Sequence, residues 1–123
     1  RCFGAYPIVA VDIVDDKLEA AKKFGATHTI NASALDPVPE IRKLTEDGVD
    51  KEFEAIGNTK TSDQIIKATR PGGTATIIGG LGNGPFTISS GRFVMSEITI
   101  TGVSSRQAHD VEEVFRMAKA GRW

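Results

Sequence analysis

Cysteine is nearly absent from this chain, whose only example is Cys2. A single cysteine excludes an internal disulfide and any metal cage built from the cysteines of this chain alone. No apolar run is long enough to span a membrane, and no cluster of lysine or arginine indicates a nucleic-acid surface. A secretory signal peptide is not evident either, so the cytoplasm is the expected compartment.

Several signatures of catalysis are also missing. The sequence has no nucleophile elbow, no phosphate loop and no paired metal ligands, so we predict neither catalytic nor metal-binding residues in this chain. His28 and His109 are isolated, which is more typical of structural than of catalytic histidines. Glu52 and Glu54 share one face of a predicted strand, but nothing beside them indicates a general acid–base pair.

The start of the sequence lacks an initiator methionine. Residues 1–7 resemble the end of a helix, with Gly4 as its stop and Pro7 just beyond. We therefore expect the sequence to be an internal piece of a longer protein. Its 123 residues, 40% hydrophobic and 25% charged, are typical of one soluble globular domain.

Short apolar strands alternate with amphipathic helices along the chain. Asp36 before Pro37 marks one helix start, and Thr61 with Gln64 has the form of a capping box. The predicted strands are Ile8–Asp12, Ala26–Ile30, Val49–Ile56, Thr74–Ile78 and Glu97–Thr101. The predicted helices lie at 15–24, 36–47, 61–69 and around 111–118, with a helical turn at 90–95, a loop at 79–85 and an extended piece at 86–88.

This alternation predicts an α/β fold with an open, parallel, doubly wound sheet, because parallel strands need crossover helices. Ligands of such sheets bind outside the carboxyl ends of the strands. The strand ends that we expect to form one rim are Asp12-Ile13, Ile56-Gly57, Gly79-Gly80 and Val103-Ser104.

Asp12 ends a strand that is apolar throughout, which predicts burial on both faces. An acid at this place binds the adenosine ribose in dinucleotide folds and repels a 2′-phosphate. Alternatively, Asp12 caps or begins the turn into the next helix. The residues of this stretch alone do not separate the two interpretations.

Other residues on the rim have similar alternatives. Gly57 and the pair Gly79-Gly80 remove side chains where the backbone could approach a ligand, or they serve turn geometry. Ile13 and Ile56 could supply apolar faces for an adenine, although Ile56 could equally be a core residue. Lys17, one helical turn beyond Asp12, could reach a ribose hydroxyl or phosphate, or could be a solvated surface lysine.

Five pieces of the sequence, in order and without large gaps, together resemble the zinc-dependent medium-chain alcohol dehydrogenases. They are Val11 to Leu18, Ala21 to His28, Gly48-Val49-Asp50, Phe53 to Gly57, and Arg70-Pro71-Gly72-Gly73-Thr74. The resemblance runs from about Ala5 to Arg122. It implies a Rossmann-type domain of an NAD-dependent, zinc-bearing enzyme that oxidises alcohols to aldehydes or ketones as a homo-oligomer.

Carried onto the matching positions, the resemblance implies a cofactor site. Asp12 would bind the adenosine ribose and favour NAD over NADP, and Lys17 would support the same ribose. Ile13 with Ile56 would enclose the adenine. The residues near the nicotinamide end would be Ile78, Gly79, Gly80 and Val103, and Gly57 would also belong to the cofactor site. The strand Glu97–Thr101 would pair with its copy in a second subunit.

The sequence also departs from that family. The glycine-rich turn expected about 20 residues before Asp12 is missing. We therefore expect residues 1–123 to be a partial dinucleotide-binding domain that lacks the first strand, with the zinc-bearing catalytic domain outside this chain. Without that strand, the strands at Ile8 and Phe53 should each have an unpaired edge.

Two other functions remain open on the sequence. The chain could be a non-catalytic nucleotide-binding or dimerisation module, or a different parallel-sheet nucleotide binder of the methyltransferase type. If the chain is instead a fragment of an alcohol dehydrogenase, as the resemblance implies, we expect the chain alone to have no enzymatic activity.

Overall fold

The chain folds as an α/β protein in which the paired strands run parallel. The structure, a computed structural model, describes residues 1–80, 82, 85, 87–104 and 108–121. The predicted loop at 79–85 and the extended piece at 86–88 lie partly outside the described residues. Two compact units make up the described chain. One contains Arg1–Leu35 and the C-terminal helix, and the other is Asp36–Ser104.

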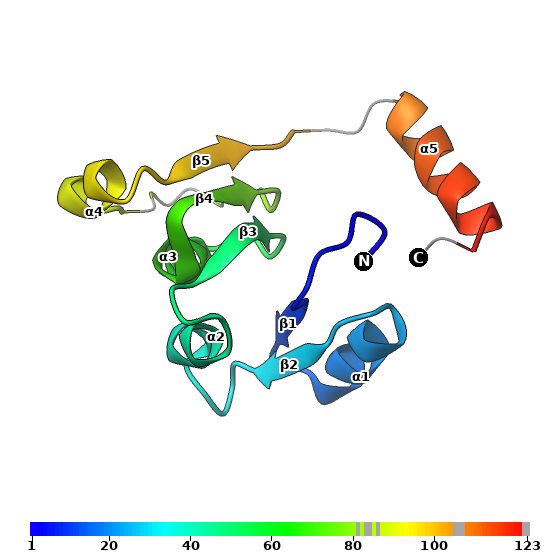
Figure 1. The fold of residues 1–123 in the computed structure, drawn as a ribbon, viewed down its shortest axis with the longest axis horizontal. Coiled ribbons are helices and arrows are strands. Elements are labelled where there is room, and N and C mark those ends of the chain that lie inside the picture. Colours follow the sequence, from blue (N-terminus) through cyan, green and yellow to red (C-terminus); the bar gives the residue numbers. More distant parts are fainter. Residues whose placement is uncertain (81, 83–84, 86, 105–107, 122–123) are drawn as a thin grey trace. The chain divides into compact units, whose positions relative to one another are not determined.

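The first unit contains a two-stranded sheet of β1 (Val9–Asp12) and β2 (His28–Asn31), drawn in blue tones in Figure 1. Helix α1 (Asp15–Lys23) connects the two strands and contacts both. It ends where the sequence predicts, because Gly25 adopts a φ of 104° that favours glycine. The same unit includes α5 (Ala108–Lys119).

The prediction that the first strand is buried on both faces is wrong. Val11 is 38% exposed, and the other residues of β1 are half-buried. Within the described ranges β1 pairs with β2 alone, and α1 packs beside it. One neighbouring strand and one helix leave part of an apolar strand accessible to solvent.

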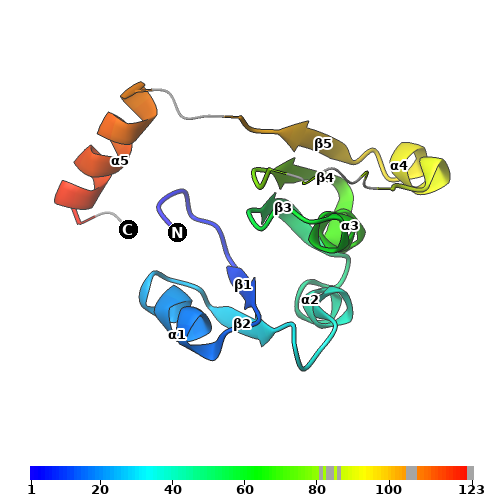
Figure 2. The same ribbon diagram turned by 180° about the vertical axis from the view of Figure 1, so that it is seen from behind.

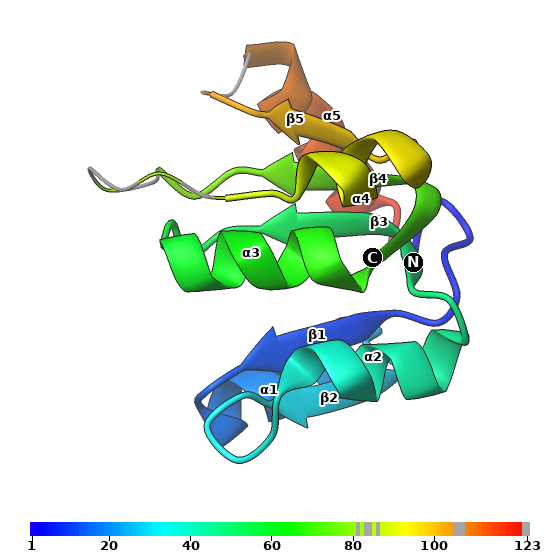
Figure 3. The same cartoon turned by 90° about the vertical axis from the view of Figure 1, so that its left-hand side faces the viewer.

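The second unit contains a parallel three-stranded sheet in the order β3-β4-β5. Figures 2 and 3 show the three arrows running the same way, with α3 beside the sheet. Helix α3 contacts β3 and β4, and α2 contacts α3. The elements are α2 (Pro37–Thr45), β3 (Val49–Glu54), α3 (Thr59–Ala68), β4 (Thr69–Ile77), α4 (Ser90–Met95) and β5 (Thr99–Gly102). The buried apolar residues of this unit are Ile41, Ile66, Ala68, Ala75 and Ile98.

Strand β3 pairs with β4 alone among the described residues, and Phe53 on it is exposed. Together with the single pairing of β1, this agrees with the prediction that both strands have an unpaired edge.

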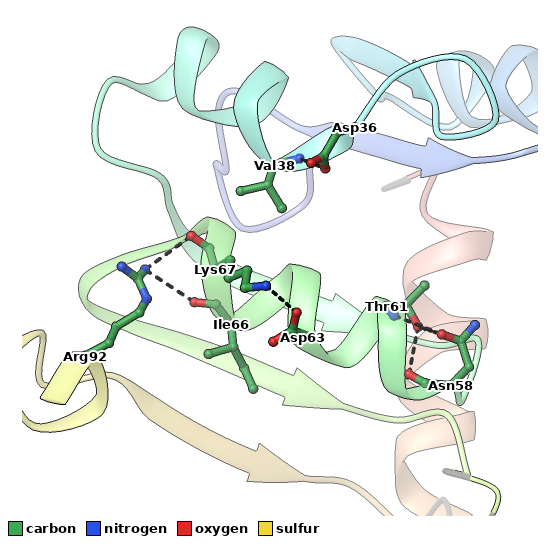
Figure 4. Close-up of polar contacts among 8 residues, drawn as sticks. All are labelled: Asp36, Val38, Asn58, Thr61, Asp63, Ile66, Lys67 and Arg92. Carbon is green, nitrogen blue, oxygen red and sulfur yellow. Dashed lines mark hydrogen bonds and ion pairs between the residues drawn. The ribbon is translucent and has the colours of Figure 1, made fainter. Parts of the chain in front are cut away.

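The two ends of α3 are held by side chains outside the helix (Figure 4). At the N-terminus the Asn58 side chain accepts a hydrogen bond from the Thr61 backbone N–H, at 2.9 Å. The predicted cap at Thr61 is therefore wrong by three residues, because asparagine is as good a cap and precedes it. At the C-terminus Arg92 Nη2 donates to the carbonyl groups of Lys67 and Thr69, at 3.2 and 3.1 Å.

Strand β4 begins at Thr69, five residues earlier than predicted, because residues 70–73 extend it through an irregular pairing with β3. Arg70 anchors this irregular start. Its Nε and Nη2 atoms donate to Asp50 Oδ1 at 2.8 and 2.6 Å, and these bonds hold the pKa of Asp50 below its usual value.

Glu52 is the one buried acid on β3 whose side chain lacks full hydrogen bonding among the described residues. It is 8% exposed, and its Oε2 atom has no hydrogen-bond partner. Burial raises the pKa of Glu52 from 4.5 to about 8, because the ionised form loses hydration. The folded chain therefore keeps a proton on Glu52 at neutral pH that the unfolded chain releases.

We predict that Glu52 makes the chain less stable as pH rises from 4.5 to about 8. In this interval the folded state binds more protons, so the free energy of unfolding falls by up to about 1.4 kcal/mol per pH unit. Glu52→Gln removes this slope, because glutamine does not titrate. Urea unfolding at several pH values measures the difference.

The control is Glu112→Gln, which alters an exposed acid on α5. It should leave the slope as it is in the unchanged chain. An equal slope in Glu52→Gln and the unchanged chain would show that Glu52 does not hold this proton.

Candidate functional site

The predicted site residues fall into two groups, one in each unit. Asp12, Ile13 and Lys17 belong to the first unit, at the carboxyl end of β1 and the start of α1. The second group follows the carboxyl ends of β3, β4 and β5. Its members are Ile56, Gly57, Ile78, Gly79, Gly80 and Val103.

Asp12 uses one carboxyl oxygen to shape the turn after β1. Its Oδ1 atom accepts hydrogen bonds from the N–H groups of Ile13 and Val14, at 2.8 and 3.0 Å. The N-cap position of α1 is Val14, so Asp12 is not the helix cap. Asp12 therefore takes part in the turn into α1 without capping the helix, and its second oxygen is not used in that turn.

The second oxygen of Asp12 faces Lys17. Lys17 Nζ lies 3.8 Å from Asp12 Oδ2, and the Lys17 side chain is largely exposed. A loose ion pair of this kind contributes little to stability. The Asp12 carboxyl oxygen and the Lys17 ammonium group therefore lie side by side and are partly accessible to solvent. The side chain of Ile13, which follows Asp12 in the sequence, is exposed.

Exposed apolar side chains follow the strand ends of the second unit. Ile56 is 66% exposed, which rules out the alternative that it is a core residue. Ile78 and Val103 are about half exposed, and the Val103 N–H donates to the Ile77 carbonyl at 2.9 Å. Side chains of this kind at the ends of parallel strands can cover a flat ligand.

Gly57 and Gly79 bring the ends of β3 and β4 into direct backbone contact. A Cβ atom on Gly79 would lie 2.3 Å from the Gly57 nitrogen, and one on Gly57 would lie 2.4 Å from the Gly80 carbonyl oxygen. Gly57 also has a φ of 85°, which favours glycine. The glycines therefore serve close approach of backbone to backbone as well as turn geometry.

Glu54 is the residue of this site that sequence reasoning missed. It is 2% exposed, and its Oε1 atom accepts hydrogen bonds from Ile56 N–H, Gly57 N–H and the Thr61 hydroxyl, at 3.0, 2.9 and 2.6 Å. The sequence contains a signal for this role. Glu54 is an acid at the end of β3, as Asp12 is at the end of β1, and Gly57 follows Glu54 three residues later.

We predict that Gly79→Ala lowers the free energy of unfolding by about 1–3 kcal/mol, because the added methyl group overlaps backbone atoms that cannot move freely. Gly80→Ala is the matched control, since a Cβ at Gly80 meets nothing within 4 Å. It should change the free energy of unfolding by less than about 0.5 kcal/mol. Urea titration of both variants measures the difference, and equal midpoints would contradict the close packing.

The described residues contain no group of three or more His, Cys, Asp or Glu side chains that could bind a metal ion. None of their helices combines the length and the apolar character needed to cross a membrane.

Comparison with known proteins identifies the family. The model of the family described as zinc-binding dehydrogenase matches residues 1–120. A curated relative, the NAD-dependent alcohol dehydrogenase of Saccharolobus solfataricus, is 34% identical over 94% of this chain and 33% of its own length.

Solved structures agree with this match. The benzyl alcohol dehydrogenase of Acinetobacter calcoaceticus superposes with a TM-score of 0.89 at 31% identity, covering 97% of this chain and 34% of that one. A Sinorhizobium meliloti protein bound to NADP superposes with a TM-score of 0.77 at 29% identity, covering 80% of this chain and 30% of that one. The chain thus spans about a third of the length of these relatives. It belongs to the zinc-binding dehydrogenase family and has the fold of that family's Rossmann-type domains.

Proposed function

We propose that this chain is the NAD-binding portion of an alcohol dehydrogenase and that Asp12 selects the cofactor. The observation that carries the proposal is the carboxyl group at the end of β1, with Oδ1 fixed by the turn and Oδ2 beside Lys17. A carboxyl oxygen and an ammonium group in this place suit the two hydroxyls of an adenosine ribose. When bound, NAD would supply the hydride acceptor for alcohol oxidation in the parent enzyme, and Asp12 and Lys17 would hold its adenosine ribose.

The apolar and glycine residues fit other parts of the same cofactor. Ile13 and Ile56 each have an exposed side chain of the kind that packs on an adenine ring. Gly79 and Gly80 follow β4 without side chains, and Ile78 and Val103 extend this surface toward the nicotinamide end. We assign these residues to the cofactor and none to the chemical step.

Zinc does not fit the described residues of this chain, because no suitable set of ligands is grouped there. Since the chain spans about a third of the length of its relatives, we propose that the zinc of the parent enzyme belongs to a further domain of that enzyme.

We predict that Asp12→Asn shifts cofactor preference from NAD toward NADP. Asparagine keeps an oxygen for the turn but removes the negative charge that repels a 2′-phosphate. The ratio of the dissociation constants for NADP and NAD should fall by about tenfold, and Asp12→Ala should weaken NAD binding by a similar factor. Calorimetric titration with each cofactor provides the measurement.

Asp16→Ala is the control, because Asp16 is an exposed acid in the first turn of α1. This variant should bind both cofactors like the unchanged chain. If Asp12→Asn leaves the ratio unchanged, the assignment of Asp12 to the ribose is wrong.

We also predict that the purified 123-residue chain oxidises no alcohol when supplied with NAD. In the proposed function this chain helps to bind the cofactor, and other parts of the parent enzyme bind the metal that holds the alcohol. Absorbance of NADH measures turnover with a panel of primary and secondary alcohols. Any turnover above the level of a mock purification would contradict the prediction.

A non-catalytic dimerisation module is the second candidate function, and the position of β5 favours it. β5 pairs with β4 on one edge and has no second partner among the described residues. An unpaired edge can join the same strand of a second copy, which also supports a homo-oligomer through Glu97–Thr101. A chain that dimerises but binds neither NAD nor AMP would favour this candidate.

A further inference from the structure

The carboxyl group of Glu54 is fully enclosed at the end of β3. Oε1 accepts hydrogen bonds from the N–H groups of Ile56 and Gly57 and from the hydroxyl of Thr61, and Oε2 accepts a second bond from Gly57 at 3.0 Å. The side chain thereby joins the strand end, the loop after it and the first turn of α3. Figure 4 shows the Asn58–Thr61 cap of that turn.

The main chain of Glu54 makes a second connection. Its carbonyl oxygen accepts hydrogen bonds from the N–H groups of Ile78 and Gly79, at 2.7 and 2.9 Å. One residue therefore bonds directly to the backbone at four positions that we assign to the cofactor, Ile56 and Gly57 after β3 and Ile78 and Gly79 after β4.

The side chain of Glu54 also limits what can stand opposite it. A Cβ atom on Gly79 would lie 2.7 Å from Glu54 Oε2, so the carboxyl group and the glycine fit together without spare room. Ile56 remains largely exposed while its N–H is bonded to Glu54, so the loop backbone is fixed and the isoleucine side chain faces solvent.

From this arrangement we infer that Glu54 is a positioning residue for nucleotide binding. Its carboxyl group holds the loop 55–57 in the conformation that presents Ile56 to the adenine and lets Gly57 and Gly79 touch. Glu54 does not contact the cofactor itself. The inference rests on the proposed function, because it names what sets the geometry of the same site.

Comparison with Glu52 shows that burial of an acid on β3 is not enough to fix the loop 55–57. Glu52 lies on the same face of β3, two residues before Glu54, and is also buried. Its Oε2 atom has no partner, whereas both oxygens of Glu54 accept hydrogen bonds from the loop that follows the strand. A buried acid that is fully bonded specifies one conformation of its neighbours.

The test compares Glu54→Leu and Glu54→Gln with the unchanged chain in two measurements. Titration with NAD and AMP should show about tenfold weaker binding for Glu54→Leu, because the N–H groups of Ile56 and Gly57 lose their acceptor. Glu54→Gln keeps one acceptor oxygen and should give an intermediate loss. Amide hydrogen exchange should become faster at Ile56 and Gly57 in Glu54→Leu, while Ala75 in β4 stays protected.

Glu52→Gln is the matched control and should leave both nucleotide affinity and the exchange of Ile56 and Gly57 unchanged. If Glu54→Leu does not fold, Glu54→Gln and Thr61→Val, which removes one donor to Oε1, carry the comparison. Nucleotide affinity equal to that of the unchanged chain in the folded Glu54 variants would overturn this inference alone. Failure of the unchanged chain to bind NAD or AMP would overturn the proposed function and this inference with it.

Discussion

Glu54 ties the ends of two parallel strands together through both its side chain and its main chain. The carboxyl group bonds to the loop after β3, and the carbonyl oxygen bonds to Ile78 and Gly79 after β4. Parallel strands place their carboxyl ends at one edge of the sheet, so a constraint at one strand end reaches the next. The close approach of Gly57 and Gly79 depends on this arrangement, since any larger residue would separate the two ends.

Two acids at strand ends serve different purposes because their surroundings differ. Asp12 is partly accessible and divides its oxygens between a turn and an ion pair with Lys17. Glu54 is enclosed, and both of its oxygens accept hydrogen bonds from its own chain. An accessible carboxyl oxygen can exchange water for a ligand hydroxyl, whereas an enclosed one can only shape the backbone around it.

Much of the fold could be predicted from the sequence, because helices and strands have distinct apolar periods. The C-terminal end of α1 just before Gly25 and the N-cap of α2 at Asp36 lie where the residue types place them. Predictions that needed tertiary contacts were wrong: the burial of β1, the start of β4 and the cap of α3. Asn58 and Thr61 are both good caps, and only the path of the chain after β3 decides between them.

The sequence by itself determined the parallel α/β class and the family resemblance, and it named the strand ends that we propose for the cofactor. These follow from local patterns that neighbouring residues carry. Only the tertiary structure decided that Ile56 is exposed, that Gly57 and Gly79 touch and that Glu54 is enclosed while Glu52 lacks a partner. Exposure and hydrogen bonding depend on residues that are distant in sequence. Glu52 and Glu54 lie two residues apart on one face of β3, so the sequence alone could not distinguish their surroundings.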